Sequence, residues 1–81
     1  MGRSDLTPEE RDVLENVDEG NSDTHQLGIF TSLAPDAILA VLDALERRGL
    51  VTLVKKYDEH YKAAYWQAET TEKGKGVLRA Q

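Results

Sequence analysis

Apolar residues in the first part of the chain recur at helical spacing. Val13, Leu14 and Val17 form one stripe, because residues three and four apart lie on the same helix face. Residues 7–10 (Thr-Pro-Glu-Glu) offer a threonine cap, a proline suited to the first helical position and a glutamate three residues after the cap. Residues 18–22, with Gly20 free to adopt the left-handed conformation, end this first predicted helix.

A short second helix is predicted after that turn. Asp23 or Thr24 can cap it, and Leu27 and Phe30 fall on one side. Gly28 has no side chain, so the pattern predicts that a neighbouring helix approaches closely there.

A third helix is predicted from Pro35 to about Arg48, after a turn at residues 31–34. Four apolar residues have the spacing of one buried face: Ile38, Val41, Leu42 and Leu45. Gly49 is the expected stop, and Leu50 is expected to fold back onto the last turn.

The remaining pattern predicts a hairpin and a last helix. Residues 50–57 and 64–70 read as two strands, joined by a polar tip at residues 58–63. Tyr65 and Trp66 alternate across the second strand, so one is expected in the core and the other outside.

The tail, residues 71–81, has a threonine cap at Thr71 and apolar contacts at Val77 and Leu78. Gly74 and Gly76 each cost about 1 kcal/mol relative to alanine inside a helix, which predicts a short, weak helix. The order of elements predicts an α+β fold, a winged helix-turn-helix with a three-helix core, a two-stranded β-hairpin wing and a short C-terminal helix. At 81 residues the chain is expected to be a single domain, 1–81.

Two junctions and a set of anchors carry a resemblance to a known family. Residues 45–51 (Leu-Glu-Arg-Arg-Gly-Leu-Val) look like a helix-to-wing junction, and residues 71–74 (Thr-Glu-Lys-Gly) look like a wing-to-helix junction. The helix-turn-helix spacing is carried by Leu27, Gly28, Leu33, Pro35, Ile38, Val41 and Leu42. From Thr7 to about Ala80 the chain thus resembles the winged helix-turn-helix domain of multiple-antibiotic-resistance (MarR) type transcriptional regulators.

The resemblance implies a DNA-binding transcriptional regulator that binds double-stranded DNA and is commonly dimeric through helices flanking the winged core. About six residues precede the first predicted helix here, and the sequence ends at Gln81. A homodimer is therefore expected to use the first helix, the tail or the recognition helix itself.

The recognition helix of such a domain enters the major groove and meets base edges near its N-terminus. The corresponding positions in this sequence are Ala34, Asp36, Ala37, Leu39, Ala40 and Ala44. Alanine donates no hydrogen bond, and an aspartate accepts only from cytosine, so weak base readout is expected. The face formed by Asp36, Ala37, Leu39 and Ala40 is open to three interpretations: apolar contact with thymine methyl groups, an interface with a protein partner, or a solvated surface.

The predicted wing has more nucleic-acid chemistry. Lysine charges and tyrosine hydroxyls bind phosphates, and the candidate contacts are Lys55, Lys56, Tyr57, His60, Tyr61 and Lys62. Asp58 and Glu59 oppose that attraction, and a solvated tip is the alternative.

Charge is divided unevenly along the chain. The net charge is −5, with eleven acids and four bases in residues 1–49 (−7) and four acids and six bases in residues 50–81 (+2). The segregation favours a nucleic-acid contact in the second part over the first, and a solvated surface with randomly distributed charge is the alternative.

Other function classes lack the residues they need. The chain has no cysteine, and its two histidines, His25 and His60, lie in separate elements, so we expect no enzyme activity, no metal site and no cofactor. No apolar run approaches the ~20 residues that span a bilayer, and residues 1–5 lack a signal segment, so no membrane and a cytoplasmic location are expected. Two functions remain: a DNA-binding transcriptional regulator, and a winged-helix module that binds a protein through its acidic, partly apolar recognition-helix face.

Overall fold

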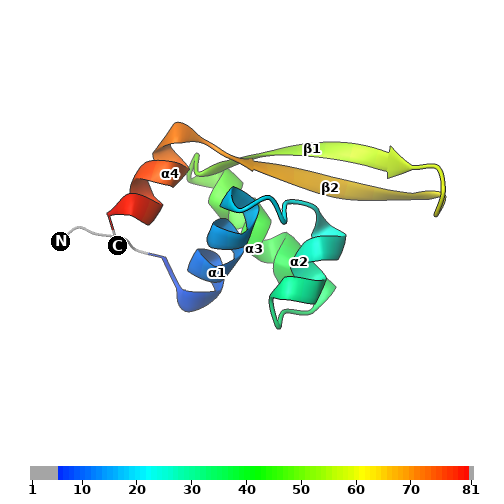
Figure 1. Ribbon diagram of the computed structural model, residues 1–81, viewed down its shortest axis with the longest axis horizontal. Helices are drawn as coiled ribbons and strands as arrows, with labels where there is room; N and C mark the ends of the chain where they lie inside the picture. The colour runs from blue at the N-terminus through cyan, green and yellow to red at the C-terminus, as the bar shows by residue number, and fades with distance from the viewer. Residues whose placement is uncertain (1–5, 81) are drawn as a thin grey trace.

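The computed structural model describes residues 6–80, which form four helices and an antiparallel β-hairpin (Figure 1). The elements in chain order are α1 (Pro8–Asp18), α2 (Thr24–Phe30), α3 (Pro35–Arg47), β1 (Val51–Asp58), β2 (Ala63–Thr70) and α4 (Glu72–Arg79). The α+β winged-helix class predicted from the sequence is confirmed. Residues 1–5, where the sequence lacks a signal segment, and Gln81 lie outside the described residues.

The predicted first helix forms with its capping box. The Glu10 N–H donates to the Thr7 hydroxyl (3.1 Å), and the Thr7 N–H donates to the Glu10 carboxylate (3.0 Å). Gly20 has a φ of +107° just after the helix, as expected for the residue that ends it. The helix is tied to α3 by an ion pair between Glu10 and Arg48 (3.5 Å).

The junction from α3 into the wing has the hydrogen bonds of a Schellman motif. Gly49, at φ +77°, donates to the Glu46 carbonyl (2.9 Å), and Leu50 donates to the Leu45 carbonyl (3.0 Å). Leu50 is buried, so the predicted fold-back onto the last turn of α3 is confirmed. This motif fixes the direction in which β1 leaves the helical body.

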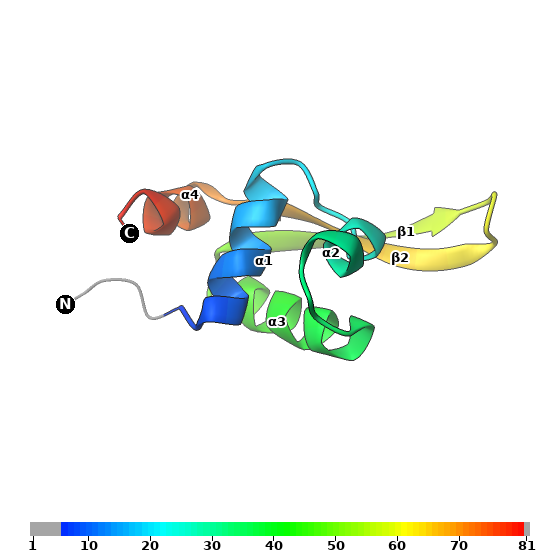
Figure 2. The same ribbon diagram turned by 60° about the horizontal axis from the view of Figure 1, so that its bottom comes forward.

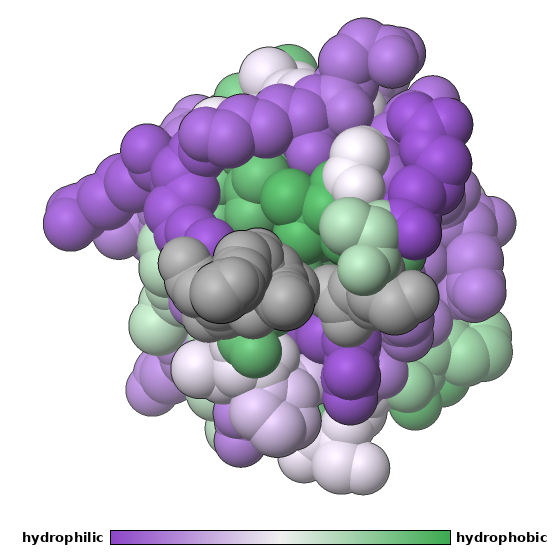
Figure 3. Space-filling view, turned by 90° about the vertical axis from the view of Figure 1, so that its left-hand side faces the viewer, coloured by the Kyte–Doolittle hydropathy of each residue, from purple (hydrophilic) through white to green (hydrophobic). Residues whose placement is uncertain are grey.

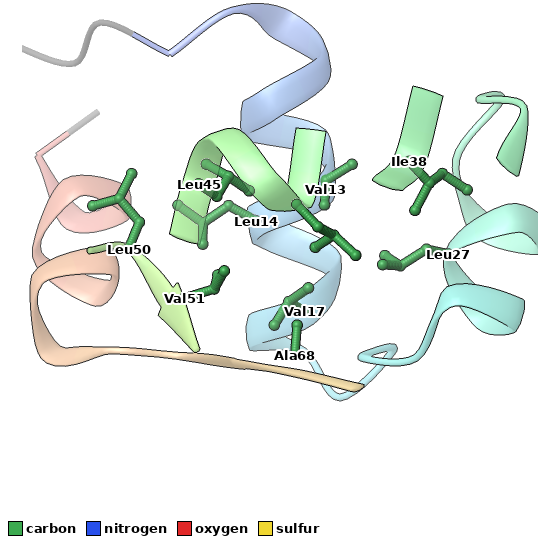
Figure 4. Packing of buried hydrophobic residues seen from close by; sticks show 10 residues of the cluster. Val13, Leu14, Val17, Leu27, Ile38, Leu45, Leu50, Val51 and Ala68 are labelled. Atoms are coloured by element: carbon green, nitrogen blue, oxygen red, sulfur yellow. The ribbon is translucent and has the colours of Figure 1, made fainter. Parts of the chain in front are cut away.

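The core lies between the three N-terminal helices and the base of the hairpin (Figure 4). Its buried members are Val13, Leu14, Val17, Leu27, Ile38, Leu42, Leu45, Leu50, Val51 and Ala68. The predicted faces of α1 and α3 are confirmed, with Val41 half-buried at the edge of the cluster. At about 25 cal/mol per Å² of apolar surface, each fully buried leucine stabilises the fold by about 2 kcal/mol.

Leu27 and Phe30, which the sequence places on one side of α2, differ in burial, and only Leu27 is in the core. Phe30 is 58% exposed, whereas Thr31 is buried and donates its hydroxyl to the Leu27 carbonyl (2.6 Å). The chain therefore places residue i+4 from Leu27, not residue i+3, against the body, and leaves the aromatic ring in solvent.

The close helix contact predicted at Gly28 is also absent. Gly28 is exposed, and a Cβ built there would lie 3.9 Å from Ile38 Cδ1, which is an ordinary van der Waals distance. A methyl group would fit at this position.

The two strands pair from Val51 with Thr70 to Asp58 with Ala63, within one residue of the predicted bounds. A short bridge of Asp23 with Gln67, and a hydrogen bond from the Ala68 N–H to the Ser22 carbonyl (2.8 Å), fasten the start of α2 to the other edge of β2.

The prediction that either Tyr65 or Trp66 enters the core is wrong. Both are half-buried, and Ala68 is the β2 residue in the core. Tyr65 and Trp66 pair with Lys56 and Lys55, farther from the base of the hairpin than Ala68, so the core ends before it reaches either ring.

The packing of α4 explains why residue 74 is a glycine, which helix propensity alone does not. It is buried, and a Cβ there would overlap the Leu50 carbonyl oxygen and lie 2.9 Å from Thr70 Cγ2. Thr71 caps α4 by accepting from the Gly74 N–H (3.0 Å) and donates its own hydroxyl to the Gly49 carbonyl (2.6 Å). The glycine therefore lets α4 pack directly against the junction between α3 and β1.

Among residues 6–80 no single helix is long and apolar enough to cross a membrane; only α2 and α3 taken together reach that length and composition, with a bend of 113° between them.

Candidate nucleic-acid interface

Helices α2 and α3 have the geometry of a helix-turn-helix. Four residues, 31–34, join them, and the chain direction changes by 113° from one helix to the other. Two helices at about 90–120° with a three- or four-residue turn are the arrangement in which the second helix is presented to a DNA groove. Figure 2 shows α3 along one side of the body, with the wing extending past its N-terminal end.

The exposed face of α3 carries the residues that sequence reasoning singled out. Asp36, Leu39 and Ala40 are exposed and Ala37 is half-buried, while the opposite face packs into the core. The structure therefore brings these four positions together on one surface. That surface offers a carboxylate and apolar atoms, with no side-chain donor for guanine or adenine edges.

The N-terminal end of α3 has no side-chain cap, and an exposed ion pair lies near its C-terminal end. Ala34, the N-cap residue, provides no side-chain acceptor for the first N–H groups of the helix. Near the other end Arg47 pairs with Asp43 across one turn (3.1 Å), with both side chains more than half exposed. Such an exposed pair contributes little to stability, and it offsets the charge of Arg47 as a phosphate ligand.

The wing lysines do not form one cluster. Alternation along β1 places Lys55 on the side of Val51, which enters the core, and Lys56 on the opposite side. The Lys55 ammonium lies 5.7 Å from the centroid of the Trp66 ring, its cross-strand partner. The two neighbouring lysines are thus directed to different surroundings.

The tip of the wing is ordered by Asp58. One of its carboxylate oxygens accepts from the His60 N–H (2.8 Å) and the Tyr61 N–H (3.2 Å). The rings of His60 and Tyr61 meet edge to face at 4.8 Å, and Lys62 takes a left-handed φ of +52°. The acid at the tip is therefore a turn-forming residue, and the predicted contacts Tyr57, His60, Tyr61 and Lys62 are all exposed.

The positive charge of the C-terminal part is concentrated in α4. From Val51 to Thr70 the hairpin has three lysines and three acids, a net charge of zero. From Glu72 to Arg79 the last helix has three bases and one acid, a net charge of +2. Figure 1 shows α4 at the opposite end of the molecule from the wing tip, so the charge segregation seen in the sequence does not make the wing basic.

Sequence reasoning missed an apolar surface at the end of α2. Ile29 is 63% exposed and Phe30 58% exposed, immediately before the turn that leads to α3. The signal in the sequence was the apolar run of Ile29 and Phe30 next to Leu27, because a seven-residue helix with one core contact cannot bury all three.

The end of the molecule that carries α4 has apolar side chains of its own. Figure 3 shows them recessed among hydrophilic residues. Leu6, Val77 and Leu78 are half-buried against the core. An interface there would leave α3 and the wing accessible.

A helix-turn-helix followed by a two-stranded wing and a closing helix defines the winged helix-turn-helix class. Within that class the chain has the fold of the MarR-type regulators, as its sequence predicts. No protein-family model matches the sequence, and no curated protein is significantly similar to it.

Three solved structures share this fold with the chain. MarR itself is 20% identical with a TM-score of 0.71, over 91% of this chain and 53% of that one. The zinc-responsive MarR family member ZitR of Lactococcus lactis is 19% identical with a TM-score of 0.78, over 98% and 53%. The transcriptional regulator Tm0710 of Thermotoga maritima is 25% identical with a TM-score of 0.72, over 93% and 51%. The chain thus spans about half the length of the structures that it matches.

Proposed function

We propose that this chain, residues 1–81, is a single DNA-binding domain of a transcriptional regulator, without catalytic activity or a cofactor. The observation that carries the proposal is the helix-turn-helix of α2 and α3 with a wing extending beside it. The regulators MarR, ZitR and Tm0710 share this arrangement of elements, which supports it.

The chemistry of the two surfaces divides their roles. Lys55, Lys56 and Lys62 of the wing supply charge that suits phosphates. Tyr57, His60 and Tyr61 are exposed beside these lysines and add hydrogen-bonding groups. At the N-terminus of α3, Asp36 in the first turn opposes a phosphate. Ala37, Leu39 and Ala40 offer methyl groups for thymine and nothing for purine edges, so base readout is weak.

Fluorescence anisotropy tests this proposal with labelled duplex DNA from the region upstream of the chain's own coding sequence and with a scrambled duplex. Titrations run at roughly 50 and 200 mM salt, since phosphate contacts are lost steeply with ionic strength. The variant Lys56→Ala/Lys62→Ala removes two wing charges, and Lys73→Ala/Lys75→Ala removes the same charge from α4 as a matched control. Binding that weakens in the wing variant but not in the α4 variant is expected. Equal losses in both would overturn the assignment of the wing, and no binding at low salt would overturn the DNA function.

A second candidate function rests on the exposed apolar residues. Ile29, Phe30 and Leu39, the last 43% exposed, belong to the helix-turn-helix, and Asp36 and Asp43 add negative charge on α3. Apolar groups with an acidic surround suit a protein partner with a basic, apolar segment better than they suit phosphates. In this role the winged helix binds protein through α3.

The two candidates respond differently to the same substitutions. Phe30→Ser and Leu39→Ser leave every wing lysine in place, and both positions are exposed, so the fold is expected to remain. Loss of DNA affinity in Lys56→Ala/Lys62→Ala, with little change in the serine variants, supports the regulator. Unchanged lysine variants, together with a partner that is lost on serine substitution, support the protein-binding module.

A homodimer is part of the first proposal. The apolar side chains at the α4 end, including Val77 and Leu78, lie away from the wing tip, so an interface there leaves both DNA-binding surfaces free. Sedimentation equilibrium tests this with Leu78→Asp, which is expected to lower the average mass toward that of one chain. An average mass that does not change places the interface elsewhere.

A further inference from the structure

A hollow of about 360 Å³ lies between the start of α2 and the outer part of the wing. It follows the edge of β2 that faces away from β1. The bridge of Asp23 with Gln67 occupies that edge at one point. From Ala63 to Trp66, the edge has no other hydrogen bonds within residues 6–80 than those of its ladder with β1. The hollow is therefore a place where the sheet edge is open.

The lining of the hollow combines aromatic and acidic side chains. Its residues are Asp23, His25, Asp58, Tyr61, Ala63, Ala64 and Tyr65. Lysine and arginine are absent from this set. Two aspartates and two tyrosines thus border one hollow, and no lysine or arginine is among the residues that line it.

The carboxylates are held in position by local hydrogen bonds. Asp23 caps α2 by accepting from the Gln26 N–H (2.7 Å), and Asp58 accepts two N–H groups of the wing turn. Each carboxylate makes these hydrogen bonds through only one of its two oxygens. Neither aspartate has an ion-pair partner in the part of the chain that the structure describes. Both carboxylates are therefore fixed in place, and neither is neutralised by an ion pair within residues 6–80.

We propose that this hollow binds a small organic ammonium compound. Aromatic faces attract cations electrostatically, most strongly where water is partly excluded, and the two carboxylates favour the same charge. The volume falls within the range of small-molecule sites. A metal ion is a poorer occupant, because no group of three or more His, Cys, Asp or Glu side chains in residues 6–80 is arranged to hold one.

The site spans the start of α2 and the outer part of the wing, beyond the bridge of Asp23 with Gln67. Asp23 and His25 belong to the helical body, whereas Asp58, Tyr61 and Tyr65 belong to the wing. An occupant in contact with both would fix the angle of the wing relative to α3. An effect on DNA affinity rests on the proposed function; ligand binding itself does not.

The test is a titration of the isotope-labelled chain, without DNA, followed by backbone amide NMR. The probe is benzyltrimethylammonium, and the control probe is benzyl alcohol, an uncharged aromatic. Saturable shifts in His25, Tyr61 and residues 63–65 are expected, with a dissociation constant of roughly millimolar for a ligand of this size. The cation is expected to bind about tenfold more tightly than the neutral probe.

Conservative variants separate charge from structure. Asp23→Asn/Asp58→Asn removes both charges while keeping the helix cap and the turn, because asparagine serves in both places. Glu9→Gln/Glu15→Gln makes the same charge change on exposed positions of α1. The asparagine variant is expected to lose about tenfold in affinity, and the glutamine variant to bind as the parent does.

Three results would overturn the proposal: equal affinity for the charged and neutral probes, unchanged affinity in the asparagine variant, or shifts confined to residues outside the hollow. DNA titrations of the same variants are read separately. Failure of cation binding leaves the DNA-binding proposal intact, and failure of DNA binding leaves the cation site intact.

Discussion

The two glycines of α4 are expected to respond in opposite directions to the same substitution. At Gly74 an added Cβ would overlap the Leu50 carbonyl oxygen and lie 2.9 Å from Thr70 Cγ2. The obstacle is backbone, so α4 as a whole must move, and overpacking of this kind costs about 1–3 kcal/mol. Alanine recovers about 1 kcal/mol of helix propensity. The clash involves backbone and is more severe than a crowded side chain, so we expect Gly74→Ala to lower the free energy of unfolding by about 2 kcal/mol.

At Gly76 the same methyl group meets nothing within 4 Å. Only the propensity term remains, so Gly76→Ala is expected to raise the free energy of unfolding by about 1 kcal/mol. For a domain of this size 1 kcal/mol corresponds to about 4–8 °C in Tm. Urea unfolding followed by Trp66 fluorescence and by circular dichroism measures both variants. A Gly74→Ala variant as stable as Gly76→Ala would refute the close approach of α4 to Leu50.

Three further substitutions test the local structure by the same unfolding assay. Gly28→Ala is expected to stabilise the fold by up to about 1 kcal/mol, because alanine has the higher helix propensity and its methyl group would lie 3.9 Å from Ile38 Cδ1. A loss of stability would instead support the close helix contact that the sequence predicts. Thr7→Ala removes the acceptor of the Glu10 N–H and is expected to cost about 1 kcal/mol, with Thr7→Ser near the parent value as its control. Gly49→Ala forces alanine to φ +77° and is expected to cost about 1–2 kcal/mol; a neutral result would contradict the left-handed end of α3.

Local rules predicted most of the fold because the signals agree with one another. The capping box at Thr7, the apolar face of α3 and the Gly49 stop each depend on residues within one or two helical turns. Such features need no knowledge of the rest of the chain. The helix and strand bounds in the structure accordingly lie within about two residues of those predicted.

The errors arose where tertiary packing decides the outcome. Phe30 and Thr31 compete for the same buried position after Leu27, and helical spacing alone does not choose between them. Gly74 reads as a weak point of a helix until Leu50 is seen beside it. Sequence ranks glycine by propensity, whereas the structure shows which glycine the packing requires.

The candidate interface was predicted as a set of residues but not as an arrangement. All the wing residues named from the sequence are exposed, yet the alternation of β1 separates Lys55 from Lys56. The +2 charge of residues 50–81 favoured a nucleic-acid contact there, but all of that excess belongs to α4, because the hairpin has no net charge. Charge counted along a chain becomes a surface property only when the elements are placed in space.

The wing charge sets a limit on the affinity of one domain for DNA. Three lysines neutralise about three phosphates at most, which gives a slope of about −3 in the logarithm of the binding constant against the logarithm of salt concentration. Two wings of a homodimer on one duplex would double the slope to between about −5 and −6. The slope measured in the anisotropy titrations therefore indicates whether one wing or two wings contact the DNA. Suppose the slope is near −3 although sedimentation equilibrium shows a dimer. The second wing would then not reach the duplex, and the dimer interface would not be the α4 end, which leaves α3 and the wing of both chains accessible.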